Sequence, residues 1–451
     1  MKTIFLFLLI AVVGRVNAQY TAIPDANFEQ ELINQEIDTD GVLNGQVLTS
    51  DVNMVTNLYV YSNNLYNVIG LEDFTSLQFL DIEQCYNLTE LNLTENLNLV
   101  SINCRNNNLT YLNISNNILL EGLHCGDNNL TTLDVTNNAN LHVIYCQNNH
   151  LSGLDVSNNL NISTLYCYNN NITALDVSTN INLVEFHCDY NQITTLNINN
   201  SPALLLLTCS HNQLTSLNIT NVPQFVRLIC GSNSLNDLDI NDLPTIKDLS
   251  CENNLLTELN LTNNVNLRTL ICFNNHINNL NLNNNSLLNV VSFANNNMNI
   301  MQIQNGNNGL LFGQFSNGST PPVYFNRFNA TNNPNLHCIF VDDVANCTAN
   351  WLGVDTTSHF VATQAECDAL SNEEFSSNEI SVYPNPVKDI LYINNKNETI
   401  EAIVVYDVLG KKVMEQNNNN AQINISDLKS GFYVVKIKTN SRTTRKKIIK
   451  E

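Results

Sequence analysis

Cysteine is the residue type whose spacing in this chain first points to chemistry, because nine of its 13 cysteines follow one another at intervals of 21 residues. A thiol can form a disulfide, ligate a metal ion or act as a nucleophile. Each role needs particular neighbours, so the residues around the period decide between them. The nine positions are Cys104, Cys125, Cys146, Cys167, Cys188, Cys209, Cys230, Cys251 and Cys272.

Apolar residues replace cysteine where the period runs past its ends. Val60 and Ile82 fill the position at steps of 22 before Cys104, and Phe293 fills it after Cys272. The position therefore demands a hydrophobe, and a free thiol behaves as a small one. Stacked strands would bring neighbouring positions to about 4.8 Å, within disulfide range, but an unbroken column of nine cannot pair completely. We expect buried free thiols.

The 21-residue spacing of the cysteines does not favour a metal site. Zinc sites use close ligand pairs such as CxxC, which are absent, and no histidine shares the cysteine position. Burial also keeps a thiol protonated and inert. We expect no metal and no other cofactor.

An asparagine stands three residues after the cysteine position in eleven of twelve coils, and Cys85 takes its place in the second. An amide can both donate to and accept from backbone groups at a turn. We therefore predict a structural ladder formed by Asn63, Asn107, Asn128, Asn149, Asn170, Asn191, Asn212, Asn233, Asn254, Asn275 and Asn296.

The repeating unit LxxLxCxxNxLxxLxVxxNxx resembles the leucine-rich repeat, whose signature is LxxLxLxxN/CxL. The resemblance covers about residues 55–300, in twelve copies in register. It implies a solenoid of the α/β class, mostly parallel β coils with 21-residue repeats and one strand per coil on the concave side. The second half of each unit echoes the first, so we expect a short strand or an extended segment opposite.

The termini and the charge restrict the class of protein further. Residues 1–18 have the lysine, apolar run and small residues of a secretory signal peptide, and no later stretch is long and apolar enough for a transmembrane segment. From residue 19 to residue 375 the chain has five cations against 33 carboxylates, a formal charge of −28. That field excludes nucleic acid as a partner.

Both open ends of a stacked solenoid need caps. Residues 19–54 form the expected N-terminal cap, with a short amphipathic helix in IPDANFEQELINQ. The next loop resembles an EF-hand loop at Asp38 and Asp40, but Val42 and Thr49 replace two ligands, so calcium binding by residues 38–49 stays open.

Residues 301–368 form the expected C-terminal cap, where the repeat is lost and the single tryptophan, Trp351, appears. The segment NNPNLHCIFVDDVANCTANW resembles the closing segment of leucine-rich repeat proteins from flavobacteria-like bacteria. Cys338, Cys347 and Cys367 lie off the period, where an oxidising compartment permits one disulfide, and we favour Cys338 with Cys367.

After a linker at residues 369–378, residues 379–451 alternate apolar and polar residues, which predicts a small all-β, sandwich-like domain. This stretch resembles the C-terminal sorting domain of the bacterial type IX secretion system. The resemblance implies that this machinery exports the protein, that the domain is removed, and that the body is released or attached at the cell surface. The residues that carry it are Pro384, Asn385, Pro386, Gly410 and Gly431 to Tyr433.

Residues that flank a buried position on a strand point outward. Rings with polar tips there suit a sugar ring or a protein hot spot. Cross-strand stacking, which stabilises a sheet by about 0.2–1 kcal/mol a pair without any ligand, is the alternative. The candidates are a stripe of His124, Tyr145, Tyr166 and His187, with Tyr168 and Asp189 beside it.

Two further surfaces follow from the same alternation. Four apolar residues in outward positions would form a patch for a partner protein, unless curvature or self-association shields them: Leu205, Leu206, Val226 and Ile229. On the opposite side a column of carboxylates recurs, which we interpret as a solvated acidic face and not as a cation site: Asp134, Asp155, Asp176 and Asp239.

Catalytic motifs such as GxSxG, HExxH or a phosphate-binding glycine loop are absent. A polysaccharide-degrading parallel β-helix would need paired carboxylates across a groove or a base, whereas the carboxylates here are spread along the coils. We therefore expect no enzyme but an exported binding or adhesion protein that recognises a protein or glycan through its concave face. A structural spacer or coat component is the alternative.

Overall fold

The structure is a computed structural model that describes residues 19–199, 201–316, 324–377, 380–394, 399–417, 420–440 and 443–451. The predicted signal peptide, residues 1–18, lies outside the described residues. The chain divides into two units, Met1–Ala362 and Thr363–Glu451, and each is described by itself.

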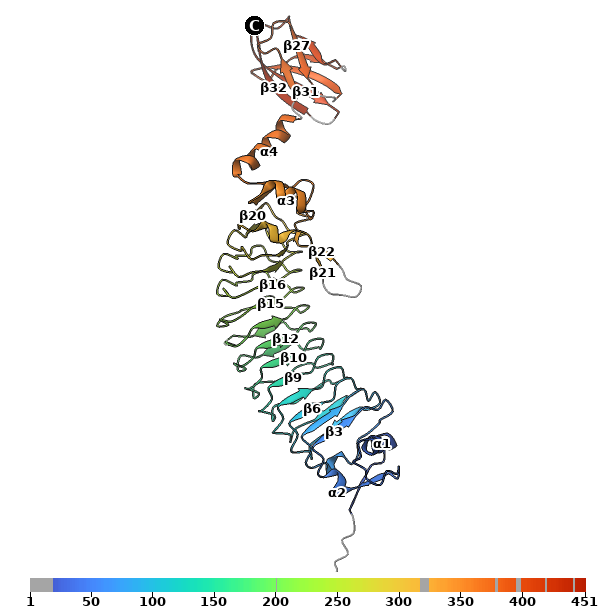
Figure 1. Ribbon diagram of the computed structural model, residues 1–451. Helices are drawn as coiled ribbons and strands as arrows, with labels where there is room; N and C mark the ends of the chain where they lie inside the picture. The colour runs from blue at the N-terminus through green and yellow to red at the C-terminus, as the bar shows by residue number, and fades with distance from the viewer. Residues whose placement is uncertain are drawn as a thin grey trace, which may run out of the picture. The chain divides into compact units, whose positions relative to one another are not determined.

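Each repeat contributes one short strand to a single 13-stranded sheet (Figure 1). Neighbouring strands are parallel and shifted by one repeat, so that Leu165 lies between Ile144 and Phe186. The predicted leucine-rich repeat solenoid is confirmed. The strands are β3 (Asn57–Val60), β4 (Phe79–Ile82), β6 (Ser101–Asn103), β8 (Gly122–His124), β9 (Val143–Tyr145), β10 (Thr164–Tyr166), β12 (Glu185–His187), β14 (Leu206–Thr208), β15 (Arg227–Ile229), β16 (Asp248–Ser250), β17 (Thr269–Ile271), β19 (Val290–Ser292) and β23 (Phe328–Asn329).

The second halves of the repeats form strands only in places, and elsewhere they run as turns and extended segments. Where strands form, they pair in parallel with the strand of a neighbouring coil. Three small sheets result: β5 (Glu90–Asn92) with β7 (Tyr111–Asn113); β11 (Ala174–Asp176) with β13 (Thr195–Asn197); and β18 (Asn279–Asn281), β20 (Ile300–Ile303), β24 (Cys338–Val341) and β25 (His359–Val361).

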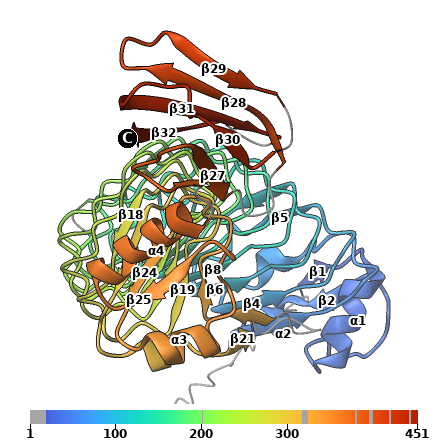
Figure 2. The same ribbon diagram turned by 90° about the horizontal axis from the view of Figure 1, so that it is seen from above.

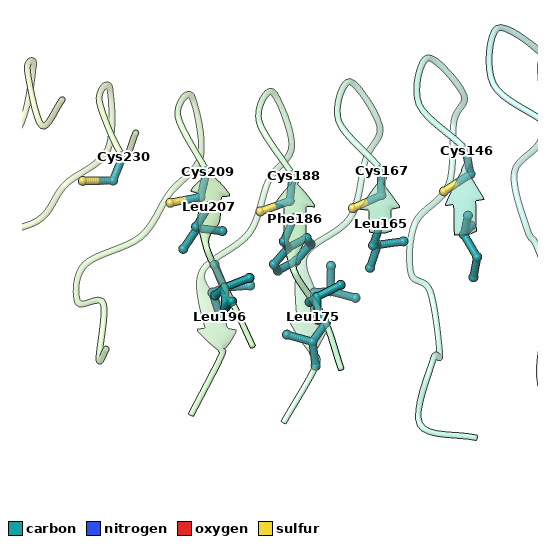
Figure 3. Close-up of a cluster of buried hydrophobic side chains, with 14 of the residues drawn as sticks. Cys146, Leu165, Cys167, Leu175, Phe186, Cys188, Leu196, Leu207, Cys209 and Cys230 are labelled. Atoms are coloured by element: carbon teal, nitrogen blue, oxygen red, sulfur yellow. The ribbon is translucent and has the colours of Figure 1, made fainter. Parts of the chain in front are cut away.

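The cysteines of the 21-residue period fill the interior of the coils. All nine are free and 0% exposed. In Figure 3 the sulfurs of Cys146, Cys167, Cys188 and Cys209 point the same way on successive coils. The predicted buried free thiols are confirmed.

The asparagine ladder beside the cysteines satisfies buried backbone groups. Asn170 donates from Nδ2 to the carbonyl oxygens of Cys146 (3.0 Å) and Cys167 (3.1 Å), and its Oδ1 accepts from the Leu151 N–H at 3.0 Å. The same pattern starts at Asn107. Asn63, which the sequence places in this ladder, is instead exposed on the first coil.

A second asparagine ladder lies in the other half of the coils. Asn159 donates to the carbonyl oxygens of Val135 (2.9 Å) and Asn138 (2.8 Å), but its buried Oδ1 has no partner among the described residues. Three successive coils interrupt this ladder with Ser201, Val222 and Leu243. Its members are Asn96, Asn117, Asn138, Asn159, Asn180, Asn264 and Asn285.

The N-terminal cap has the predicted helix. The Asp25 side chain accepts from the Asn27 N–H at 2.9 Å and caps the helix, which buries Phe28 and Leu32 against the first coils. An antiparallel strand pair and a single helical turn complete the cap. Its elements are β1 (Tyr20–Ala22), α1 (Ala26–Asn34), β2 (Gln46–Leu48) and α2 (Thr49–Val52), and a 3-10 turn, η1 (Leu71–Asp73), follows in the first coils.

The stack continues past residue 300, where the 21-residue period ends. Strand β23 extends the large sheet, and Asn333 takes the ladder position by donating to the carbonyl oxygens of Phe293 (3.2 Å) and Ala330 (3.0 Å). A long insertion before Phe328 breaks the 21-residue spacing, so the sequence period does not reveal these coils. Trp351 closes the core against Phe328, with ring centroids 4.0 Å apart. The added elements are η2 (Asn308–Leu311), β21 (Gln314–Ser316), β22 (Tyr324–Asn326) and α3 (Val344–Asn350).

The second unit begins with helix α4 (Gln364–Ser377), which spans most of the predicted linker. Two antiparallel sheets follow and share a core around Leu391, Val405 and Val435 (Figure 2). The predicted all-β domain is confirmed. One sheet holds β26 (Ser381–Tyr383), β27 (Ile390–Asn394) and β30 (Gln422–Asn424); the other holds β29 (Lys412–Gln416), β28 (Ile400–Asp407), β31 (Gly431–Thr439) and β32 (Thr443–Lys450).

Candidate functional site

The aromatic stripe lies on four adjacent strands of the 13-stranded sheet. Parallel register places His124 beside Tyr145, Tyr145 beside Tyr166, and Tyr166 beside His187. Successive ring centroids are 4.5, 4.6 and 4.3 Å apart, and the interplanar angle grows from 28° between the tyrosines to 69° at His187. The two tyrosines therefore stack, His124 is tilted against Tyr145, and His187 meets Tyr166 in an edge-to-face arrangement.

Tyr166 is the best anchored ring of the stripe. Its hydroxyl donates to Glu185 Oε2 at 2.9 Å, and its ring centroid lies 6.4 Å from that of Tyr168. Burial, followed by the hydrogen bond to Glu185, raises the pKa of Tyr166 to about 12. Burial also raises the pKa of Tyr168. Both phenols stay neutral at physiological pH; the Tyr168 hydroxyl can donate to a ligand, whereas the Tyr166 hydroxyl donates to Glu185 and can accept from one.

A hydrogen-bond network closes the stripe at His187. The ring Nδ1 of His187 lies 3.0 Å from Thr208 Oγ1, and Thr208 donates to Asp189 Oδ2. The other oxygen of Asp189 accepts from the Ser210 N–H at 2.8 Å. Sequence reasoning named His187 and Asp189 but missed Thr208 and Ser210, although both flank Cys209 in the same two outward columns.

The two histidines of the stripe are neutral in the folded protein at pH 7. Burial lowers the pKa of His187, against the opposing charges of Asp189 and Glu185. Burial, helped by Arg105, lowers the pKa of His124. Each imidazole therefore keeps one donor and one acceptor nitrogen.

A second ring pair, which sequence reasoning missed, stands at the turn after the sheet. Tyr190 and His211 stack with centroids 4.2 Å apart and an interplanar angle of 10°. Both have left-handed backbone, with φ of 52° and 54°. The equivalent position is Asn, Asp or Ser in the other cysteine coils, and Asn, Asp and His adopt this conformation more often than other side chains do. Tyr190 is therefore the residue that departs from what the fold prefers.

The apolar candidate patch is less continuous than its sequence implies. Leu205 is 36% exposed, and Leu206, Val226 and Ile229 are half-buried. The register neighbour of Leu206 is Arg227, whose guanidinium pairs with Asp248 at 3.0 Å. This ion pair separates Leu206 from the apolar residues of later coils.

The carboxylate column on the opposite side has a local structural role. Asp134 Oδ1 accepts from the Thr136 N–H, and Asp155 Oδ1 accepts from the Ser157 N–H, each at 3.0 Å. Asp176 and Asp239 repeat the contact. Hydrogen bonds of this kind, from side chain and backbone, lower the pKa values of Asp134, Asp155 and Asp176.

Among the described residues, no free cysteine exposes a thiol that could react. Eleven cysteines are free and buried, and burial raises the pKa of Cys104, for example, to about 12. Cys338 and Cys367 are the disulfide-bonded cysteines. Their pairing with each other stays a prediction.

The EF-hand-like loop shows no metal-binding constellation. Within the described residues, no three His, Cys, Asp or Glu side chains are arranged to hold a metal ion. Asp40 instead accepts from the Val42 N–H and from Asn44 Nδ2. Glu29 Oε1 accepts from three successive backbone N–H groups at residues 44–46.

Solved structures similar to this chain come from Listeria monocytogenes. An internalin, InlF, is 22% identical with a TM-score of 0.55, over 61% of this chain and 84% of its own. The functional domain of InlJ, which includes a cysteine ladder, is 23% identical with a TM-score of 0.53, over 97% of this chain and 100% of its own. These likenesses establish the leucine-rich repeat fold.

Residues 381–451 match the family of secretion system C-terminal sorting domains. Here Asn385 accepts from the Ile449 N–H at 2.8 Å and donates to the Lys447 carbonyl at 3.1 Å, while Gly410 takes a positive φ of 81° at a turn. Within the described part of the chain, no helix has the length and apolar character of a membrane span.

A curated relative is the ulvan lyase NLR42 of Nonlabens ulvanivorans, 28% identical over 109 residues. The match covers 24% of this chain and spans a fifth of the length of that relative.

Together, the solenoid and the sorting domain define an exported leucine-rich repeat protein. It is secreted or attached at the outer surface after the type IX secretion system has removed the sorting domain.

Proposed function

We propose that the protein is a binding or adhesion protein that recognises a protein or glycan through the face of its 13-stranded sheet. The observation that carries the proposal is the four-ring stripe from His124 to His187, which leads into the network of Thr208 and Asp189. Phenols and imidazoles supply hydrogen-bonding groups there, beside the carboxylates of Glu185 and Asp189.

The aromatic site favours recognition over sheet stabilisation for two reasons. The stripe ends in polar groups whose hydrogen bonds fix ring orientation, which lowers the entropy lost when a ligand binds. The neighbouring Tyr190, which stacks on His211, occupies a left-handed position that most other coils fill with Asn, Asp or Ser.

A glycan array and a pull-down from the producing cell's surface test this function. The double variant Tyr145→Ala, Tyr166→Ala should lose the signal of the native protein. The matched control is Tyr86→Ala, Tyr111→Ala, because both tyrosines are 50% exposed and lie off the 13-stranded sheet. Equal signals from native protein and stripe variant would remove the stripe from consideration, and ordered self-assembly without a ligand would favour a structural spacer.

A further inference from the structure

A groove of about 880 Å³ lies on the face formed by the second halves of the repeats, across four successive coils. Its floor consists of Leu238, Leu259 and Leu280, which are 4%, 7% and 2% exposed. Carboxylate and carboxamide side chains line it above these leucines. An apolar floor with convergent polar groups is the usual composition of a ligand site, and the volume falls in the usual range.

The wall of the groove differs from the coils that directly precede it. Three successive coils place longer polar side chains in one outward column, namely Asp237, Glu258 and Asn279. The same column carries small residues in the five coils before: Thr132, Gly153, Ala174, Thr195 and Ser216. The groove therefore begins where this column changes from small to longer polar side chains.

The neighbouring column is held in a fixed orientation by turn hydrogen bonds. Asp239, Asn260 and Asn281 each accept from the backbone N–H two residues further on, at 3.1, 3.1 and 3.0 Å. Among the described residues this leaves Asp239 Oδ2 without a donor, and the Nδ2 groups of Asn260 and Asn281 without an acceptor. The groove thus presents preorganised acceptors and donors about 4.8 Å apart, one coil to the next.

We infer that this groove binds an uncharged glycan chain laid across the coils. A hydroxyl group both donates and accepts, so a row of sugar hydroxyls can use the acceptor carboxylates of Asp239 and Glu258 and also the donor amides of Asn260 and Asn279. A basic peptide side chain would leave the donors unused, and an anionic glycan would meet carboxylates with no cation in the lining. Repeated groups on successive coils also match a polymer of repeated units.

The test is an array of uncharged oligosaccharides, acidic oligosaccharides and oligolysine, probed with the exported protein. The double variant Glu258→Ala, Asn279→Ala removes two exposed side chains that make no hydrogen bond among the described residues, so the fold is retained. Losing two hydrogen bonds should weaken binding of an uncharged oligosaccharide about tenfold. The matched control is Thr132→Ala, Thr195→Ala, in the same column outside the groove, which should bind like the native protein.

The stripe variant Tyr145→Ala, Tyr166→Ala distinguishes the groove site from the proposed function. If the groove is the glycan site, this variant should still bind the uncharged oligosaccharide. Loss in the stripe variant but not in the groove variant would overturn the groove site and leave the sheet site standing. The groove site would also be overturned if the native protein bound only oligolysine, bound only acidic oligosaccharides, or bound no uncharged oligosaccharide.

Discussion

At the scale of single residues, position in the repeat decides whether a reactive side chain can react. Cys167 is fully buried, while Tyr166 and Tyr168 on either side of it are partly exposed. Because successive side chains on a strand point to opposite faces, three consecutive residues place one side chain inside and two outside. The periodic thiols are therefore kept from solvent, and the side chains that flank them are exposed on the sheet face.

Replacing Asn170 by alanine tests the first asparagine ladder. The variant Asn170→Ala leaves the buried Leu151 N–H without a partner and removes one of the two asparagine donors to each carbonyl, at Cys146 and Cys167, so the free energy of unfolding should fall by about 2–3 kcal/mol. Urea unfolding followed by circular dichroism measures the loss. The adjacent exposed Asn171→Ala is the control and should change stability by less than about 0.5 kcal/mol. Equal losses would contradict the ladder.

The second ladder should be less sensitive. Asn159→Ala removes the amide donor from the carbonyls of Val135 and Asn138, each of which keeps a backbone N–H donor, and it also removes a buried Oδ1 that has no partner among the described residues. We expect a loss of about 1–2 kcal/mol in the same assay, smaller than that of Asn170→Ala. A loss as large as that of Asn170→Ala would show that the Oδ1 of Asn159 is satisfied in solution.

Asp38 offers a test of the EF-hand-like loop. It is 4% exposed, its Oδ2 has no partner among the described residues, and burial followed by the charge of Asp40 raises its pKa. A carboxyl whose folded pKa is raised opposes folding at pH 7 and ceases to do so as pH falls through that value. Asp38→Asn should therefore raise the melting temperature at pH 7 by about 2 °C. Stabilisation of the native protein by calcium, lost in the variant, would contradict this.

Residue roles were predictable where the period fixed them and not elsewhere. Twelve aligned copies identify the buried position and the asparagine after it. The left-handed turn residue, by contrast, carries Asn, Asp, Ser, Tyr or His, so composition did not reveal its backbone. Thr208 was overlooked because a hydroxyl gives no aromatic signal, and its role depends on two side chains from the coil before.

At the scale of elements, the sheet holds the stripe in one register and sets its response to pH. Burial lowers the pKa of His187 below its unfolded value of about 6.5, so its contribution to stability is present above that value and is lost as pH falls below it. The melting temperature should drop between pH 6.5 and pH 5, and the drop should be smaller in His187→Asn. An identical pH profile in both proteins would refute this assignment.

Elements with regular spacing were predictable, and elements interrupted by insertions were not. The helix in the N-terminal cap followed from its amphipathic pattern, and the structure adds that Asp25 caps it. The coils after residue 300 did not, because the insertion before β23 shifts Asn333 away from the 21-residue count. The groove on the second face also escaped prediction, since a hollow depends on how four coils pack.

At the scale of the whole molecule, the residues before and after position 375 differ in their balance of basic and acidic side chains. The body carries five cations against 33 carboxylates, whereas the part after residue 375 has twelve basic and eight acidic residues. Since the sorting domain is removed on export, mass spectrometry should locate the mature C-terminus before residue 381, in medium or in cell envelope. A surface protein that retains residues 381–451 would contradict the assignment.

The most direct test of the central claim, that the coils enclose their thiols and display the flanking residues, is a count of reactive thiols. Labelling with a maleimide should modify none of the 13 cysteines in the folded protein, eleven after unfolding, and all 13 after unfolding with a reductant. Raising the pH to 9 should not change the first count, because burial raises the thiol pKa values. Labelling of the periodic cysteines in the folded protein, or fewer than eleven after unfolding, would contradict the account.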